Sequence, residues 1–261
     1  MHTALTIAGS DSGGGAGIQA DLKTFAAHGV YGMSALTAVT AQNTRGVVSW
    51  MALPPAIVRA QVDAVIGDIG ADAVKIGMLG NAAIVETVAA AVRELELQNV
   101  VLDPVMVAKG GNPLLEPPAV DAIRRALVPL ALVVTPNAPE AAVLTGISVR
   151  SLRDVHDAGH RILEMGARVV LIKGGHIEGA ESIDVAFTPG ETFELRGPRI
   201  DTTSTHGTGC TLSSAIAANL ALGMTVREAL QRAREYVEGA IRQAPGLGGG
   251  HGPLNHFWRS G

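Results

Sequence analysis

The hydrophobic positions of the chain form short continuous runs that alternate with longer stretches of helical periodicity. Each short run is rich in β-branched residues or leucine and leads into glycine, proline, asparagine or aspartate, which is typical of buried strands. The expected strands are Ala4–Ala8, Ala73–Ile76, Val100–Leu102, Leu132–Thr135 and Val169–Lys173, with a more dilute one at Met33–Val39. Residues 183–187 and 192–195 flank Pro189-Gly190 and predict a hairpin.

Between these runs, apolar residues recur every three or four positions, which indicates amphipathic helices. The expected helices are Ile18–Ala27, Pro55–Ile66, Ala82–Leu95, Ala119–Leu127, Ser151–Met165, a segment after Gly207 reaching Ala221, and a stripe from Val226 to Ile241. This alternation predicts an α/β fold with a mostly parallel central sheet and helices on both faces. No linker or internal repeat interrupts it, so residues 1–261 are expected to form one domain.

Composition narrows the function classes. The 261 residues are 47% hydrophobic and 17% charged, which excludes general disorder, and a net charge of −4 gives no footprint for nucleic acid. No apolar stretch reaches the ~18 residues of a membrane span, and the first residues lack the pattern of a signal peptide. Cys210 is the only cysteine, so no intrachain disulfide can form. A soluble cytoplasmic protein without membrane or nucleic-acid partners is expected.

Ligands of such sheets bind beyond the carboxyl ends of the strands, so the residues there deserve inspection. The first strand leads into Gly9–Gly17, and residues 15–20 fit the loose pattern G-x-G-x-x-A. That pattern is compatible with a dinucleotide-dependent oxidoreductase, with a flexible turn, or with a loop over a small polar ligand that has Asp21 one turn behind it. The next strand runs into Thr40-Ala41-Gln42 without the acid that would hold a ribose, which argues against the oxidoreductase. We favour the third interpretation because of the side chains at the other strand ends.

Three further strand ends carry charged or amide side chains. Asp103 precedes proline and suits either a cation site or a simple turn. Asn137 and Glu140 lie three residues apart, which equally fits a capped helix start. Lys173 ends a buried strand before two glycines, and this placement suits a cation directed at an anion.

The last strand end is the sequence His206-Gly-Thr-Gly-Cys-Thr211, which opens an apolar helix. Gly-x-Gly at a helix start leaves N–H donors free for an anion, with the helix dipole behind them. Cys210 in that first turn is expected to have a lowered pKa, unless it is a buried structural cysteine. The chain contains no G-x-x-x-x-G-K-[ST] motif and no zinc-type spacing. Together the strand ends suit a phosphate and its divalent cation.

An ordered series of motifs resembles one family over nearly the whole chain: AGSDSGGGAGIQADLKT, TAQNT, KIGMLG, VLDPVMVAKGG, TPNAPEA, LIKGGH and HGTGCTLSSAIAANLALG. They resemble the hydroxymethylpyrimidine/phosphomethylpyrimidine kinases of thiamine biosynthesis, in the ribokinase-like superfamily. The resemblance implies a three-layer α/β/α fold and homodimers. It also implies ATP- and Mg²⁺-dependent phosphorylation of 4-amino-5-hydroxymethyl-2-methylpyrimidine and then of its monophosphate.

The resemblance also implies roles for individual residues. Gly207, Thr208 and Gly209 would bind the transferring phosphoryl group, and Cys210 would be the base. Lys173, Asn137, Glu140, Thr208 and Gly209 would lie at ATP, with Asp103 and Glu140 at Mg²⁺ and its waters. The pyrimidine side would comprise Gly9, Asp21, Gln42, Met78 and Val105.

Position 42 departs from part of the family, since some members carry glutamate there. Both side chains can accept a hydrogen bond from an amino group, but only the amide can also donate to a ring nitrogen. Because related enzymes phosphorylate vitamin B6 alcohols, a pyridoxal kinase on the same fold is the main alternative function.

Overall fold

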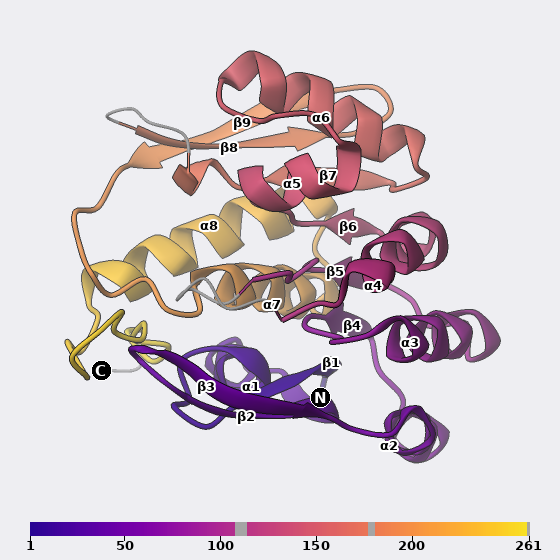
Figure 1. Cartoon of the computed structure of the whole chain (residues 1–261). Helices are drawn as coiled ribbons and strands as arrows, with labels where there is room; N and C mark the ends of the chain where they lie inside the picture. Colours follow the sequence, from indigo (N-terminus) through magenta and orange to yellow (C-terminus); the bar gives the residue numbers. More distant parts are fainter. Residues whose placement is uncertain (108–113, 177–180, 260–261) are drawn as a thin grey trace.

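The computed structural model describes residues 1–107, 114–176 and 181–259. Their strands build one nine-stranded sheet in the order β3-β2-β1-β4-β5-β6-β7-β8-β9 (Figure 1). The strands are β1 (Thr3–Asp11), β2 (Tyr31–Asn43), β3 (Gly46–Ala52), β4 (Ala73–Ile76), β5 (Val100–Leu102), β6 (Val133–Val134), β7 (Val169–Ile172), β8 (Glu181–Phe187) and β9 (Thr192–Pro198).

The sheet is mostly parallel, as the alternation of strands and helices predicts. The neighbours from β2 through β7 pair in parallel, whereas β3 joins one edge and the β8–β9 hairpin joins the other in antiparallel fashion. Strand β3 was not predicted. Its exposed apolar residues, such as Val48 and Met51, do not resemble a buried run. The hairpin prediction is confirmed.

Eight α-helices cover the described part of the sheet: α1 (Gly17–Ala27), α2 (Pro55–Asp68), α3 (Ala82–Glu94), α4 (Pro117–Ala122), α5 (Ala138–Thr145), α6 (Leu152–Glu164), α7 (Thr208–Ala221) and α8 (Val226–Arg242). A π-helical turn, Ile123–Leu127, continues α4 and completes the helix expected there. Short 3₁₀ turns occupy Val128–Leu130 and Gly174–His176. None of the described helices is long and apolar enough to cross a membrane.

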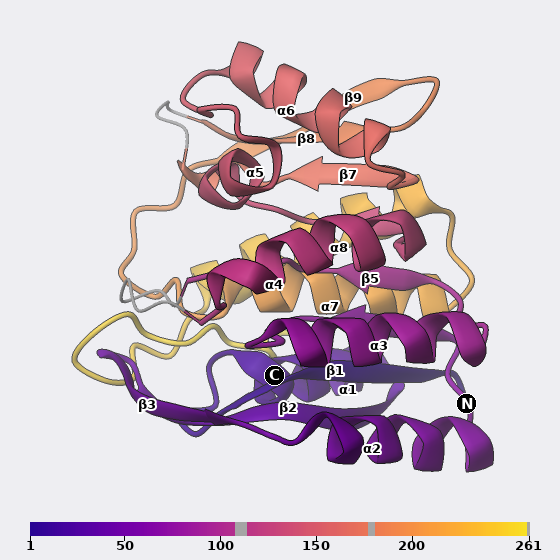
Figure 2. The same ribbon diagram turned by 45° about the vertical axis from the view of Figure 1, so that its right-hand side comes forward.

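The helices form two layers around the sheet, which confirms the three-layer α/β/α class. Side chains of α1, α7 and α8 pack on one face with Val101, and those of α2 through α6 pack on the other with Leu102 (Figures 1 and 2). Successive residues of β5 thus serve opposite layers, as strand geometry requires.

Helix α7 is the central helix of its layer and sets the position of the site. Every residue from Thr211 to Ala221 is buried, and alanine and serine dominate the stretch. Small side chains allow the helix to lie close between the sheet and α8. Its first turn therefore reaches the edge of the sheet where the parallel strands end.

Candidate active site

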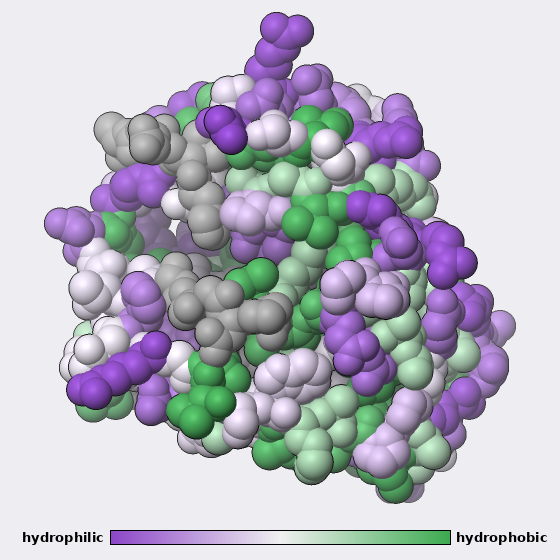
Figure 3. Space-filling model, in the orientation of Figure 1, coloured by the Kyte–Doolittle hydropathy of each residue, from purple (hydrophilic) through white to green (hydrophobic). Residues whose placement is uncertain are grey.

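A pocket of about 710 Å³ runs along the carboxyl ends of the parallel strands. Residues that follow β1, β4, β5, β6 and β7 line it, together with the first turn of α7. Figure 3 shows that this face of the molecule is hollowed. The five separated strand ends predicted from the sequence therefore meet in one cavity.

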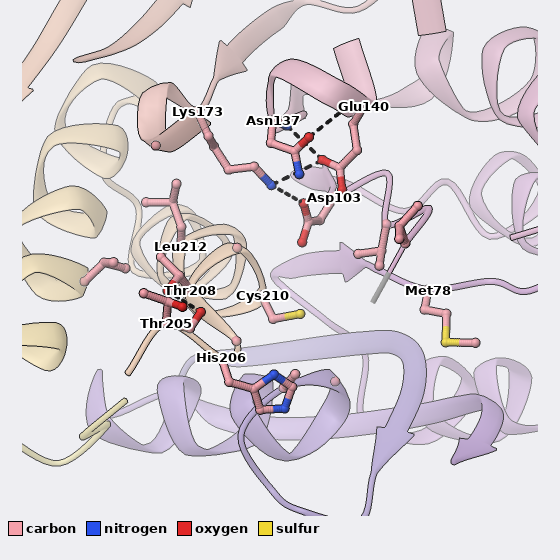
Figure 4. Close-up of a pocket in the computed structure, with 18 of the residues that line it drawn as sticks. Met78, Asp103, Asn137, Glu140, Lys173, Thr205, His206, Thr208, Cys210 and Leu212 are labelled. Carbon is pink, nitrogen blue, oxygen red and sulfur yellow. Dashed lines mark hydrogen bonds and ion pairs between the residues drawn. The ribbon is translucent and has the colours of Figure 1, made fainter. Parts of the chain in front are cut away.

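Lys173 lies between two carboxylates on one wall of this pocket (Figure 4). Its Nζ atom is 2.8 Å from Oδ1 of Asp103 and 3.6 Å from Oε2 of Glu140. Burial disfavours the ammonium ion, but the charges of Asp103 and Glu140 and the hydrogen bond to Asp103 together outweigh burial and raise the pKa of Lys173. The pKa of Glu140 is raised because its carboxyl is buried. The wall thus combines a permanent cation with acidic oxygens.

Asn137 and Glu140 also begin helix α5. The Asn137 side chain accepts a hydrogen bond from the Glu140 N–H, and the Glu140 carboxylate accepts one from the Asn137 N–H, both at 2.8 Å. This is a reciprocal capping box. The structural interpretation of the motif is therefore confirmed, and the cap also holds the Glu140 carboxylate toward Lys173.

The first turn of α7 faces Lys173 across the pocket. Gly207 precedes the helix with φ of 81°, and no side chain among the described residues caps this helix start. A Cβ atom on Gly209 would lie 3.1 Å from the Lys173 Nζ atom. Helix N–H donors and a lysine ammonium thus converge on one small volume, which suits a phosphoryl group.

Cys210 occupies the third position of α7 and lines the pocket, but its predicted acidity is wrong. Burial raises the pKa of its thiol to about 11, although the nearby Lys75 ammonium and a hydrogen bond from the Gly17 N–H oppose the rise. The cost of burying a thiolate is larger than the stabilisation that Lys75 and the Gly17 N–H give it. Cys210 is therefore a neutral thiol at pH 7 in this structure.

Asp21 does not line the pocket, in contrast to its predicted place on the pyrimidine side. It is fully buried, and its carboxylate accepts hydrogen bonds from Lys75 at 2.9 Å and from Thr6 and Ser214 at 2.6 Å each. Lys75 is equally buried, and the charge of Asp21 raises its pKa against the effect of burial. The pair joins α1, β1, β4 and α7 beneath the pocket.

The other residues predicted for the pyrimidine side do line the pocket: Gly9, Gln42, Met78 and Val105. Met78 packs so closely on Gly9 that a Cβ atom there would lie 2.9 Å from its sulfur. Met78 also belongs to a small apolar cluster with Leu114, against which Val105 packs. This end of the pocket is thus an apolar slot with one amide, suited to a flat heterocycle. The Gly110-Gly111 end of the VLDPVMVAKGG motif lies outside the described residues.

The glycine-rich loop after β1 holds a carboxylate of the protein itself. Asp11 accepts hydrogen bonds from the N–H groups of Gly13, Gly15 and Ala16, at 2.8 to 3.0 Å. These N–H groups are the donors that a dinucleotide fingerprint would offer to pyrophosphate. Because Asp11 occupies them, the G-x-G-x-x-A pattern does not form a phosphate site here.

Sequence reasoning missed several pocket residues. Lys75, Asp11 and His206 belong to the motifs given above, but no role was predicted for them. Lys75 could have been noticed, because a lysine within a buried strand is unusual. The far end of the pocket is lined by residues of the β9–α7 connection and of α8, including Arg199, Arg234, Val237 and Ile241. Val237 and Ile241 belong to a stripe that reads as ordinary core from sequence.

The site offers limited but suitable ligands for a divalent cation. Mg²⁺ takes oxygen ligands, and one or two carboxylates together with substrate phosphates usually hold it. Asp103 and Glu140 supply two carboxylates beside the phosphoryl-binding turn. No group of three or more histidine, cysteine or acidic side chains that could hold a metal occurs in the described ranges. The residues therefore fit a cation that arrives with a nucleotide.

The site places a lysine and two carboxylates opposite the N-terminal turn of a buried helix, at the carboxyl edge of an α/β sheet. This arrangement is typical of an enzyme that transfers phosphoryl groups to small molecules. The chain belongs to the phosphomethylpyrimidine kinase family, whose profile matches residues 11–255. This membership also decides against the dinucleotide-dependent oxidoreductase.

Individual relatives agree with this family. A hydroxymethylpyrimidine/phosphomethylpyrimidine kinase of Streptomyces coelicolor is 52% identical over 257 residues, covering 98% of this chain and 95% of the relative. A thiamine biosynthesis bifunctional protein of Geobacter sulfurreducens is 52% identical over 253 residues; the match covers 97% of this chain and only 52% of that longer protein. An ADP complex of Bacillus subtilis pyridoxal kinase superposes with a TM-score of 0.92 at 40% identity, covering 100% of this chain and 99% of that one.

Proposed function

We propose that this protein transfers a phosphoryl group from ATP to 4-amino-5-hydroxymethyl-2-methylpyrimidine, and then a second one to the resulting monophosphate, in thiamine biosynthesis. The observation that carries the proposal is the position of Lys173 opposite the Gly207–Cys210 turn, between the apolar slot and the pocket end lined by Arg199 and Arg234. The names of its relatives supply the substrate.

In the first step, the primary alcohol oxygen attacks the γ-phosphorus and the bond to the ADP oxygen breaks. The transition state is loose, so its charge resides mainly on the equatorial oxygens. Lys173 and the N–H groups of Thr208 and Gly209 would stabilise that charge, and one such preorganised donor is worth about 3 kcal/mol. The hydroxyl proton passes to water, or to the sulfur of Cys210 in the small fraction of molecules in which that sulfur is a thiolate.

A Mg²⁺ ion bound with ATP would neutralise phosphate charge, and Asp103 and Glu140 are the residues that would hold it or its waters. Asn137 keeps the Glu140 carboxylate in place through the capping box. Without the ion, Lys173 is the counter-charge of both carboxylates.

In the second step, the nucleophile is a phosphate oxygen that is already ionised at neutral pH. This step needs no base, so its rate would depend on Lys173 and the α7 turn but little on the thiol of Cys210. One pocket can serve both steps provided that the monophosphate places its phosphate where the hydroxyl stood.

A vitamin B6 kinase is the second candidate function, because a pyridoxal kinase shares the fold over the full chain. Gln42, Met78 and Val105 line the end of the pocket that would discriminate a pyrimidine from a pyridine. The proposal for the pyrimidine rests on the higher identity to the pyrimidine kinases and on the family match.

An ATP-consumption assay with three acceptors tests the function. We expect turnover with the hydroxymethylpyrimidine and with its monophosphate, and a lower kcat/KM with pyridoxal. A preference for pyridoxal would make the B6 kinase the correct assignment. ATP consumption with none of the three would overturn both.

We propose in addition that residues 1–261 act as a single catalytic domain, because all the strands of the described residues join one sheet. We also propose that the enzyme is cytoplasmic and, by analogy with the family, that it forms a homodimer. Light scattering of the purified protein would measure the mass of the assembly.

A further inference from the structure

His206 stands where three segments of the site meet. Its Nε2 atom is 2.8 Å from Oδ2 of Asp11, and its backbone N–H donates to the Gly252 oxygen at 3.1 Å. The amide nitrogen of Gln42 lies 3.4 Å from the same Nε2 atom. The side chain is almost fully buried, and Figure 4 shows it at the border of the pocket beside the α7 turn.

The partner of His206 is itself fully engaged. Oδ2 of Asp11 accepts the N–H groups of Gly15 and Ala16 as well as the imidazole, and Oδ1 accepts that of Gly13. Burial alone would raise the pKa of Asp11, but the hydrogen bond from His206 and those from the loop lower it. An ionised Asp11 therefore ties the glycine-rich loop after β1 to the imidazole.

Gly207, the residue after His206, brings the backbone of the α7 turn close to that of the loop after β1. A Cβ atom on Gly207 would lie 1.8 Å from the Gly15 oxygen, and one on Gly15 would lie 2.4 Å from Cδ2 of His206. Two glycines therefore allow the loop and the α7 turn to touch through their backbones. Only Gly207 separates His206 from Thr208 in the chain, so the imidazole and the phosphoryl-binding turn meet the loop at the same point.

The C-terminal segment completes the junction. Pro253 pairs with His206 as an isolated parallel bridge, and the N–H of His251 donates to the Thr44 oxygen at 2.8 Å. Thr44 lies in the turn between β2 and β3. The imidazole thus connects the phosphoryl-binding turn to the loop after β1 and lies beside Gln42 at the end of β2, while the His206 backbone connects the turn to the C-terminal segment.

We propose that His206, held by Asp11, is a positioning residue that sets the phosphoryl-binding turn of α7 against the acceptor end of the pocket. It acts through Gly207 and the loop and does not itself touch the reacting atoms. Because a misplacement of about 1 Å can cost about a hundredfold in rate, one buried hydrogen bond at this junction can control turnover. The proposal rests on the proposed kinase activity for its kinetic consequence.

Two substitutions separate this role from simple packing. Glutamine at position 206 can place an amide N–H near the Nε2 position, whereas leucine fills the volume without a donor. We expect His206→Leu to lower kcat for both phosphorylations at least tenfold, with KM for ATP changed less than threefold. His206→Gln is expected to recover most of kcat. His160→Leu, at an exposed histidine of α6 outside the pocket lining, is the matched control.

Hydrogen exchange supplies a readout that is independent of activity. In His206→Leu, backbone amides of residues 13–16 and 207–211 should exchange faster than in the wild type, and His206→Gln should restore their protection. Should His206→Leu fail to fold, His206→Gln against His206→Asn decides, since asparagine is too short to reach Asp11 from the same backbone position.

Wild-type kcat and unchanged exchange in His206→Leu would overturn the proposal, as would equal activity of the glutamine and asparagine variants. An inactive wild-type protein would overturn the kinase function alone, because the exchange experiment would still test the junction.

Discussion

The Nζ atom of Lys173 lies 2.8 Å from Oδ1 of Asp103, on the wall of the pocket that faces the first turn of α7. Strand β5 carries one partner to the sheet edge and β7 the other, with β6 between them. A buried ion pair of this kind gains little stability, because desolvation offsets the attraction. Its role here is to hold the Lys173 ammonium in its charged form on the wall of the pocket.

Gly209→Ala should test the space between Lys173 and α7. The added Cβ atom would lie 3.1 Å from Nζ and 3.7 Å from Oδ2 of Asp103, inside the volume that a phosphoryl group would need. We expect kcat/KM for ATP to fall about tenfold or more with little change in melting temperature, because alanine suits a helix. Unaltered ATP kinetics would remove this volume from the reaction path.

Gly207→Ala should damage stability and activity together. The residue has φ of 81°, where alanine costs about 1–2 kcal/mol, and its Cβ atom would also overlap the Gly15 oxygen. Gly223 is the matched control, since it has φ of 82° and open space around its Cβ position. Urea unfolding should show a larger loss for Gly207→Ala than for Gly223→Ala. Equal losses would mean that the contact with Gly15 relaxes freely.

Cys210 offers a pH test of the base assignment. Burial raises the pKa of the thiol to about 11, so the thiolate fraction rises about tenfold per pH unit from pH 7 to pH 10. If the thiolate takes the hydroxyl proton, kcat for the first phosphorylation should rise over this range and lose that dependence in Cys210→Ala.

The second phosphorylation is the internal control, because a phosphate oxygen needs no base. Cys210→Ala should reduce its kcat less than that of the first step. Equal losses in both steps would assign Cys210 to packing or positioning.

Much of the fold and part of the pocket lining were predictable from sequence, for two physical reasons. Buried parallel strands are near-continuous apolar runs, so Val100–Leu102, and even Ala73–Ile76 with Lys75 inside it, match the structure to the residue. The rule that ligands bind at strand carboxyl ends then selects Asp103 and Lys173. Strand β3 was not predicted because it is an edge strand with exposed valine and methionine, and its sequence lacks the apolar run of a buried strand.

The misassigned residues depend on three-dimensional surroundings that a sequence does not contain. The carboxyl of Asp21 accepts a hydrogen bond from Lys75, a partner 54 positions away. The pKa of the Cys210 thiol is raised by burial, which the sequence around it does not reveal. The bond between Asp11 and His206 spans 195 positions. Each of these properties depends on a contact between residues that only folding brings together.

Asp21→Asn should destabilise the fold and not merely weaken substrate binding. It would leave the fully buried Lys75 ammonium without its counter-charge, and breaking such a pair typically costs about 3–5 kcal/mol. The exposed pair of Asp121 with Arg124 is the control, and Asp121→Asn should cost less than about 1 kcal/mol. An unchanged free energy of unfolding with a raised KM for the pyrimidine would instead support direct contact with substrate.

His256 should make the protein less stable in mild acid. The side chain is buried and hydrogen-bonded to Thr211 of α7 at 3.1 Å, and burial lowers its pKa from 6.5 to about 4. Below pH 6.5 the unfolded chain therefore binds a proton that the folded protein does not, so stability falls as the pH drops toward 4. The difference amounts to about 2 kcal/mol between pH 7 and pH 5.

Urea unfolding at the two pH values measures this effect in the wild type and in His256→Gln, which has no group that titrates there. The variant should lose about 2 kcal/mol less than the wild type on going from pH 7 to pH 5. His160→Gln, at an exposed position of α6, should keep the wild-type dependence. An identical pH dependence in all three proteins would mean that His256 is protonated in the folded state, and that the buried contact with Thr211 tolerates the charge.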